Sequence, residues 1–188
     1  MTKNIMIVGV GGQGTLLASR ILGNAVISEG YDVKVSEVHG MSQRGGSVVT
    51  YVKYGEKVYS PIIDKGEADI ILAFEKLEAI RALSYLKKGG KIILNDSAIS
   101  PMPVITGACK YPEGIVETLK EKAEVVSLDA LGLSMSLGSS KAVNVVLIGV
   151  LAKSTDIDKE TWYKIIKETV PPKFLDLNLK AFDLGYNF

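Results

Sequence analysis

Two glycine clusters near the N-terminus hold the residue types that bind anions. The first is "GVGGQG", in which Gly9, Gly11 and Gly14 match the spacing G-x-G-x-x-G. Between a strand and a helix, the first glycine permits a tight turn, the second lets a ligand approach the backbone, and the third allows close helix–strand packing. The free N–H groups at the start of the following helix favour an anion. This loop is therefore a candidate phosphate or pyrophosphate site.

The residues of this loop leave other interpretations open. A glycine-rich backbone also suits a tight turn that binds no ligand, or a surface that contacts a partner. A dinucleotide site needs an acidic residue about 20 residues further on, and Glu37 stands somewhat beyond that distance. "GVGGQG" is also similar to the nucleotide loop of ubiquitin-activating-like adenylating enzymes, but these commonly use a cysteine that one Cys in the chain supports poorly.

The second cluster is "HGMSQRGGS", residues 39–47. Arg44 stands in a glycine-rich setting that leaves its guanidinium unobstructed, and Ser42, Gln43 and Ser47 add donors suited to a phosphate or carboxylate. The alternative is a hairpin turn with a solvated arginine. If both clusters lie at the carboxyl edge of one sheet, we expect an anion site made by Gly9, Gly11, Gly12, Gln13, Gly14, Ser42 and Arg44.

Other polar residues are better explained by structure than by catalysis, and we assign no catalytic residue. His39 has no evident partner for proton transfer nearby, so a structural or interface role is expected. Glu75 and Glu78 open a predicted helix, where acidic side chains act as caps. Asn95 ends a strand at the ligand edge, where Asx turns are common, and Asn144 lies on a helix from which it could bond to a neighbouring loop.

The elements that must position these residues follow from periodicity. Short apolar runs rich in β-branched residues predict buried strands, and an i, i+4 stripe over 15–29 predicts a helix packed on a sheet. The strands are expected at 4–10, 31–38, 47–54, 68–75, 89–96 and 123–130, and helices at 15–29, 76–88 and 115–122. The chain from Leu131 onward is expected to be helical. This alternation predicts an α/β class and a Rossmann-like, doubly wound, mostly parallel sheet, with a hairpin or edge-strand insertion and a helical C-terminal part.

Composition excludes several classes of function. The 188 residues are 47% hydrophobic and 23% charged with a net charge of +1, which describes an ordinary globular domain without a basic field for nucleic acid. We expect one domain over 1–188. No apolar run is long enough for a membrane helix and no signal peptide is evident, so a cytoplasmic location is expected. A single cysteine, Cys109, cannot hold an iron–sulfur cluster, and together with a single histidine it is a poor start for a metal site.

The chain resembles the gamma-type domain of the 2-oxoacid:ferredoxin oxidoreductases, including the stand-alone small subunit of the indolepyruvate branch. The resemblance spans nearly the whole chain. The segments that carry it are "GVGGQGTLLASRIL", "EVHGMSQRGGSVVTYVKYG", "VYSPIIDKGEADIILAFEKLEAIRAL", "GGKIILND", "AVNVVLIG" and "NLKAFDLG".

The resemblance implies a subunit that catalyses nothing by itself. The family, a group of anaerobic metabolism, converts a 2-oxoacid, here an aryl pyruvate such as indolepyruvate, to an acyl-CoA and passes the electrons to ferredoxin. Thiamine diphosphate, magnesium and iron–sulfur clusters are expected on a larger alpha subunit. This chain is expected to hold no cofactor and to contact CoA or to complete the wall of the partner's active site. An independent NAD(P)- or ATP-binding Rossmann-type enzyme is the alternative.

Overall fold

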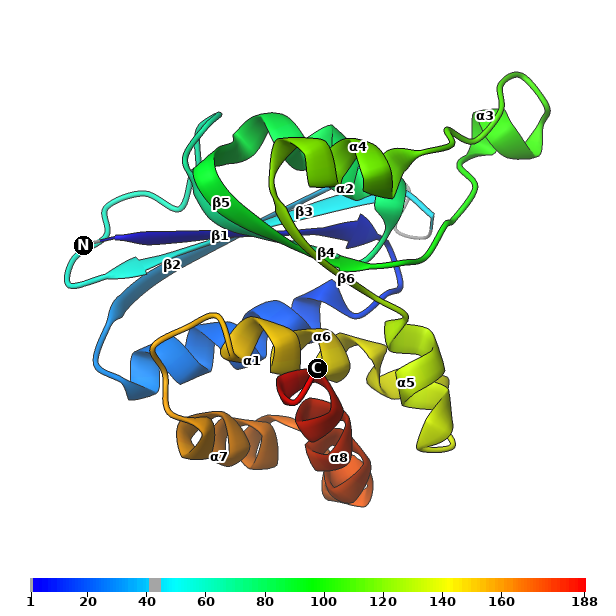
Figure 1. Ribbon diagram of the computed structural model, residues 1–188. Coiled ribbons are helices and arrows are strands. Elements are labelled where there is room, and N and C mark those ends of the chain that lie inside the picture. The colour runs from blue at the N-terminus through cyan, green and yellow to red at the C-terminus, as the bar shows by residue number, and fades with distance from the viewer. Residues whose placement is uncertain (1, 41–44) are drawn as a thin grey trace.

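The computed structural model describes residues 2–40 and 45–188 as an α/β fold built on one six-stranded sheet (Figure 1). The strand order is β2-β3-β1-β4-β5-β6. The bounds are β1 Lys3–Val10, β2 Asp32–His39, β3 Ser47–Gly55, β4 Ala68–Ala73, β5 Leu86–Asn95 and β6 Glu124–Leu128. β1, β4, β5 and β6 pair in parallel. The expected mostly parallel, Rossmann-like sheet is confirmed.

Of the two expected insertions, a hairpin or an edge strand, the structure has a hairpin, but β3 forms it with the preceding strand β2 and not with the residues that follow β3. β3 pairs antiparallel with β2 on one side, from Asp32 opposite Gly55 to His39 opposite Val48, and antiparallel with β1 on the other. The hairpin partner of β3 is thus the preceding strand, and β2 forms the edge of the sheet. Alternate β3 residues are buried in the core and hold the hairpin in this register.

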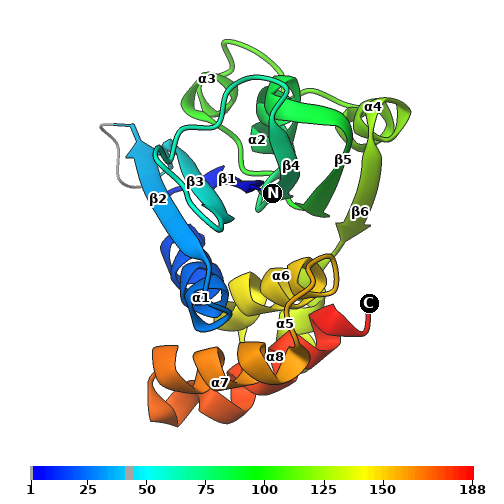
Figure 2. The ribbon, with the colours of Figure 1, turned by 90° about the vertical axis from the view of Figure 1, so that its left-hand side faces the viewer.

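Helices cover the two faces of the sheet unequally (Figures 1 and 2). One face carries α1 Thr15–Ser28, α5 Ala130–Ser136, α6 Val143–Ala152, α7 Lys159–Thr169 and α8 Leu175–Tyr186. The other carries α2 Lys76–Ala82 and α4 Ile115–Lys122. The four-residue helix α3, Met102–Ile105, lies on a loop that projects away from the body of the molecule (Figure 1). Each face has its own buried apolar cluster, and the cluster under α1, α6 and α8 is the larger.

Two glycines let α6 and α8 pack backbone to backbone. A Cβ atom added at Gly185 would overlap the carbonyl oxygen of Val146, and one added at Gly149 would overlap the carbonyl oxygen of Phe182. Nearly all of α6 is buried, which agrees with its position between the sheet and α8. The glycines of "AVNVVLIG" and "NLKAFDLG" therefore allow α6 and α8 to pack closely within the helical layer.

One helix is shorter than its sequence suggests. The expected helix over 76–88 stops at Ala82 and continues as a 3₁₀ turn, Leu83–Tyr85, because Leu86 already pairs with Ala68 of β4. The ladder then has an irregularity before the pairs Ile70–Lys91 to Ala73–Leu94. Within the described part of the chain, no helix has the length and apolar character that crossing a membrane requires.

Candidate functional site at the carboxyl edge of the sheet

The first glycine cluster forms the turn between β1 and α1 at the carboxyl edge of the parallel strands. Gly12 and Gly14 have φ angles of +102° and +84°, a left-handed conformation that favours glycine. Gly14 is also the residue that caps the start of α1, and no side chain caps this end. The first turn of the helix therefore presents backbone N–H groups towards the edge.

Gln13 braces this turn through both ends of its amide. Its Oε1 accepts the N–H of Val10 at 2.7 Å, and its Nε2 donates to the carbonyl oxygen of Phe74, at the end of β4, at 3.1 Å. Asn95, at the end of β5, donates to the same carbonyl at 3.1 Å and accepts the N–H of Ala130 at 3.1 Å. The brace thus ties the ends of β1, β4 and β5 to the start of α5.

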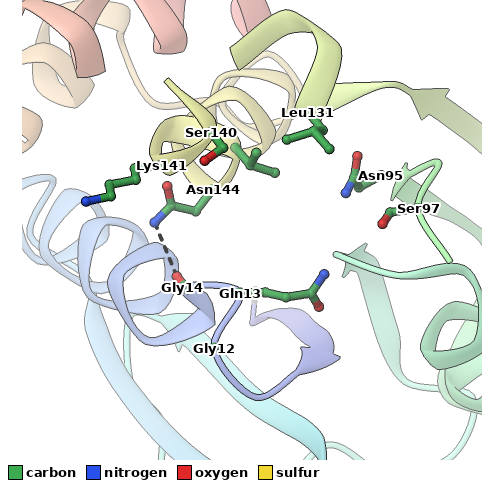
Figure 3. Close-up of a pocket in the computed structure, with 10 residues that line it drawn as sticks. Gly12, Gln13, Gly14, Asn95, Ser97, Leu131, Ser140, Lys141 and Asn144 are labelled. Atoms are coloured by element: carbon green, nitrogen blue, oxygen red, sulfur yellow. Dashed lines mark hydrogen bonds between the residues drawn. The ribbon is translucent and has the colours of Figure 1, made fainter. Parts of the chain in front are cut away.

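A hollow of about 420 Å³ opens between the glycine turn and the helical layer (Figure 3). Its lining comes from the glycine turn, the end of β5, α5 and the start of α6, namely Gly12, Gln13, Gly14, Asn95, Ser97, Leu131, Ser140, Lys141, Val143 and Asn144. Asn144 Nδ2 donates to the carbonyl of Gly14 at 3.4 Å, which confirms that Asn144 bonds to a neighbouring loop. A Cβ atom on Gly14 would lie 2.7 Å from that Nδ2.

A second hollow of about 430 Å³ lies on the other side of the glycine turn. It is lined by Gly11, Gly12, Gly14, Thr15, Leu16, Glu37, His39 and Val48. His39 is exposed, and its Nδ1 lies 3.3 Å from the carbonyl of Gly40. Glu37 Oε2 accepts the hydroxyl of Thr50 at 3.3 Å. The hollow is therefore bordered by the glycine turn, the start of α1, one carboxylate and one imidazole.

The two glycine clusters meet in the structure. The N–H of Gly11 donates to the carbonyl of Gly46 at 2.9 Å. Gly11, Gly12, Gln13 and Gly14 all border a hollow, whereas Gly9 lies inside the fold, where a Cβ would come 3.0 Å from the Cβ of Phe74. Ser42 and Arg44 lie outside the described residues, and the binding role of the whole set stays a prediction.

Sequence reasoning underrated the polar residues of the first hollow. No motif singles out Ser97 or Lys141, and Asn95, expected in an Asx turn, braces two elements. The available signal was position, because residues that directly follow β5 or precede α6 lie at the ligand edge of such a sheet. Among residues 2–40 and 45–188, no three His, Cys, Asp or Glu side chains gather as a metal site would require.

Glu75 and Glu78 are buried carboxylates at the start of α2, and the expected capping role of Glu75 is confirmed. Glu75 Oε2 accepts the N–H of Glu78 at 2.9 Å. Glu78 accepts the hydroxyl of Ser47 at 2.5 Å and pairs with Arg81 at 2.6 Å. Tyr111 donates its hydroxyl to Glu75, and burial together with this carboxylate raises the pKa of Tyr111 above its ordinary value. The Tyr111 hydroxyl therefore stays a donor at neutral pH.

Comparisons with known proteins point in one direction. Residues 4–188 match the family model described as pyruvate ferredoxin/flavodoxin oxidoreductase. The indolepyruvate oxidoreductase subunit IorB of Thermococcus kodakarensis is 45% identical over 193 residues, which covers 97% of this chain and 93% of that protein.

Two solved structures share the fold. The gamma subunit of a keto/oxoacid ferredoxin oxidoreductase from Geobacter sulfurreducens has a TM-score of 0.74 at 23% identity, and covers 98% of this chain and 96% of its own. A 2-oxoglutarate:ferredoxin oxidoreductase from Magnetococcus marinus, solved with 2-oxoglutarate, coenzyme A and succinyl-CoA bound, has a TM-score of 0.77 at 18% identity. The match covers 99% of this chain and 30% of that one.

Proposed function

This chain belongs to the pyruvate ferredoxin/flavodoxin oxidoreductase family, and from that membership we propose that it is the small, non-redox subunit of a 2-oxoacid:ferredoxin oxidoreductase. The proposed substrate is indolepyruvate or another aryl pyruvate. The observation that carries the proposal is the 45% identity, over almost the full length of both chains, to a protein named as an indolepyruvate oxidoreductase subunit.

The residues of this chain do not fit the redox groups of such a reaction. Cys109 is the single cysteine and is exposed, so this chain cannot supply the several thiolates of an iron–sulfur cluster. The sequence also has no "GDG…N" stretch of the kind that holds thiamine diphosphate through magnesium. We therefore place thiamine diphosphate, magnesium and the clusters on a larger alpha subunit, through which ferredoxin is reduced. The isolated small subunit should be inactive.

The contribution of this chain is proposed to lie at the glycine turn. Its backbone N–H groups and the open end of α1 suit the phosphates of CoA. The hollow beside Glu37 and His39 gives room for part of such a ligand, and Glu37 could accept a hydrogen bond from a ribose hydroxyl. Ser42 and Arg44 belong to the segment that joins His39 to Ser47, two residues at this same edge. CoA is also bound in the related-fold enzyme from Magnetococcus marinus.

The same edge is proposed to pack against the alpha subunit and complete its active-site wall. Leu16 and Leu131 border the two hollows and are 56% and 47% exposed, and Val38, at the end of β2, is 54% exposed. Apolar side chains around polar hollows are typical of an interface that shields a ligand from water. The two contributions are compatible because one edge supplies both.

Replacement of Arg44 by alanine in the assembled enzyme tests the CoA contribution. A guanidinium that pairs with a phosphate contributes about 1.5–3 kcal/mol, so we expect the KM for CoA to rise by at least about tenfold. Arg20→Ala, on the exposed face of α1, is the matched control and should leave that KM unchanged. Normal assembly with an unchanged KM in Arg44→Ala would remove the CoA role and leave the subunit assignment intact.

A second candidate, an independent dinucleotide-binding enzyme, is favoured by one observation. Glu37 borders the same hollow as Gly11, Gly12 and Gly14, which is the arrangement of a dinucleotide site. Titration of the isolated chain with NADH, followed by nicotinamide fluorescence, tests it. Saturable NADH binding would favour the second candidate, and ATP–pyrophosphate exchange would likewise reveal an adenylating enzyme.

A further inference from the structure

The segment between β5 and α4 forms an arm that leaves the body of the molecule. We define the arm as residues 97–111; it carries α3 at its outer end (Figures 1 and 2). Met102 and Ile105 on α3 are each 65% exposed, and Ile99 is 37% exposed. Residues 97–109 include no Asp, Glu, Lys, Arg or His, although 23% of the chain is charged. The tip of the arm is thus an uncharged apolar surface in contact with water.

One buried carboxylate holds both ends of the arm. Glu75 is 1% exposed, and its Oε1 accepts the N–H of Ile99 at 3.1 Å and the hydroxyl of Tyr111. The N–H of Lys76 donates to the carbonyl of Ser97 at 3.0 Å, which fixes the start of the arm a second time. A buried carboxylate is costly unless its oxygens accept hydrogen bonds. Here the N–H of Glu78, at the start of α2, donates to one oxygen of Glu75, and the arm donates to the other.

This anchoring makes the arm a preorganised element. The base is fixed by Glu75, and Pro101 and Pro103 restrict the backbone at α3. Binding through a segment that is already ordered avoids much of the entropic cost of ordering it on contact. An apolar tip on a fixed base is suited to insertion into a groove of another protein.

We propose that the arm docks this chain onto the larger alpha subunit, with Met102 and Ile105 inserted into an uncharged, apolar groove of that subunit. The inference rests on the proposed function, since it needs the larger subunit to exist. The uncharged tip complements an apolar groove and has nothing to offer a charged partner such as nucleic acid.

Two observations favour the larger subunit over a second copy of this chain as the partner of the arm: the small size of the arm, and its position in the molecule. A stable interface buries about 800 Å² and 20–30 residues on each partner, more than two arms can give each other. The arm lies on the same side of the molecule as α5 and the start of α1 (Figure 1), where Leu131 and Leu16 are also exposed. A partner that covers this end of the molecule can therefore contact both the arm and the carboxyl edge.

Charge placed on the tip tests the inference. The variant Met102→Glu/Ile105→Glu, co-expressed with the larger subunit of the same host, should lose co-elution or weaken the Kd by at least about tenfold, because charge would enter an apolar groove. Ile27→Glu is the matched control, since Ile27 is 55% exposed at the far end of α1. The control should assemble as the wild type does. Both the tip variant and Ile27→Glu should keep the Tm of the isolated wild-type chain, because the altered side chains are exposed.

A second variant tests the anchoring. Tyr111→Phe removes the hydroxyl bonded to Glu75 without charging the tip, so we expect faster amide hydrogen exchange over 97–109 and a smaller rise in Kd than the tip variant gives. Normal assembly of the tip variant would overturn the arm proposal while leaving the proposed function intact. Failure of the wild type to assemble would overturn the proposed function itself. A change in the self-association of the isolated chain by the tip variant would make a second copy the occupant and also contradict the proposal.

Discussion

The helical layer and the carboxyl edge both depend on glycine, but for different physical reasons. In the helical layer, Gly149 and Gly185 bring α6 and α8 so close that a single Cβ would overlap a backbone carbonyl. At the carboxyl edge, a Cβ atom added at Gly12 would have no atom within 4 Å. Glycine is needed at this position because the φ angle is +102°. In the first region, glycine allows two helix backbones to come into contact. In the second, glycine allows the left-handed conformation of a turn beside open hollows. The effect of replacing a glycine in this chain therefore depends on its backbone conformation and on the atoms around it.

The largest loss of stability is expected where glycine allows the close contact of α6 and α8. Gly185→Ala should destabilise the chain by about 3 kcal/mol or more, or prevent folding, because α8 must move away from α6 and the core beneath it opens. Urea unfolding of the isolated chain measures this. A loss below about 1 kcal/mol would mean that the two helices adjust easily, and the contrast between the two regions would disappear.

An intermediate effect is expected at Gly14, which combines both constraints. Gly14→Ala should cost about 2 kcal/mol, since a left-handed conformation costs an alanine roughly 1–2 kcal/mol and the new Cβ meets Asn144. In the double variant Gly14→Ala/Asn144→Ala the contact is gone, so the total loss should fall short of the sum of the two single losses by at least about 0.5 kcal/mol. Strict additivity in the same unfolding experiment would show that backbone conformation alone requires this glycine.

The smallest effect, of opposite sign, is expected at Gly23 in the middle of α1. A Cβ there would find only the Val35 side chain, at 3.9 Å, within reach, so the site can accept it without strain. Alanine is the better helix former by about 0.8–1.0 kcal/mol, and Gly23→Ala should stabilise the chain by about 0.5–1 kcal/mol. A loss of stability would show that α1 packs on β2 more tightly than the structure indicates.

Features encoded in local patterns could be predicted from the sequence. The helix expected over 15–29 appears as Thr15–Ser28, and the helix at 115–122 appears with those bounds, because their apolar stripes reflect burial on a sheet. The position of β3 between β1 and β2 could not be predicted, since its two sets of partners are chosen by tertiary pairing. The same holds for the early end of α2, which Leu86 decides by pairing with Ala68.

The candidate site was only partly predictable for the same reason. The glycine spacing locates the turn, but the brace from Gln13 and Asn95 to the carbonyl of Phe74 joins residues 61 and 21 positions apart and leaves no local signal. Lys141 borders the first hollow because α6 starts beside the glycine turn, a contact that no spacing in the sequence announces. The side chains of residues that follow strands deserve more weight in such folds than their residue types alone suggest.

The central claim is that this chain works as the small subunit of a larger enzyme. The most direct measurement is anaerobic affinity isolation of the chain from its native host, with the intact complex weighed by native mass spectrometry. The account predicts a heteromeric complex with a larger, cysteine-rich chain that carries thiamine diphosphate and oxidises a 2-oxoacid. A chain that emerges alone, or only with copies of itself, would contradict the claim.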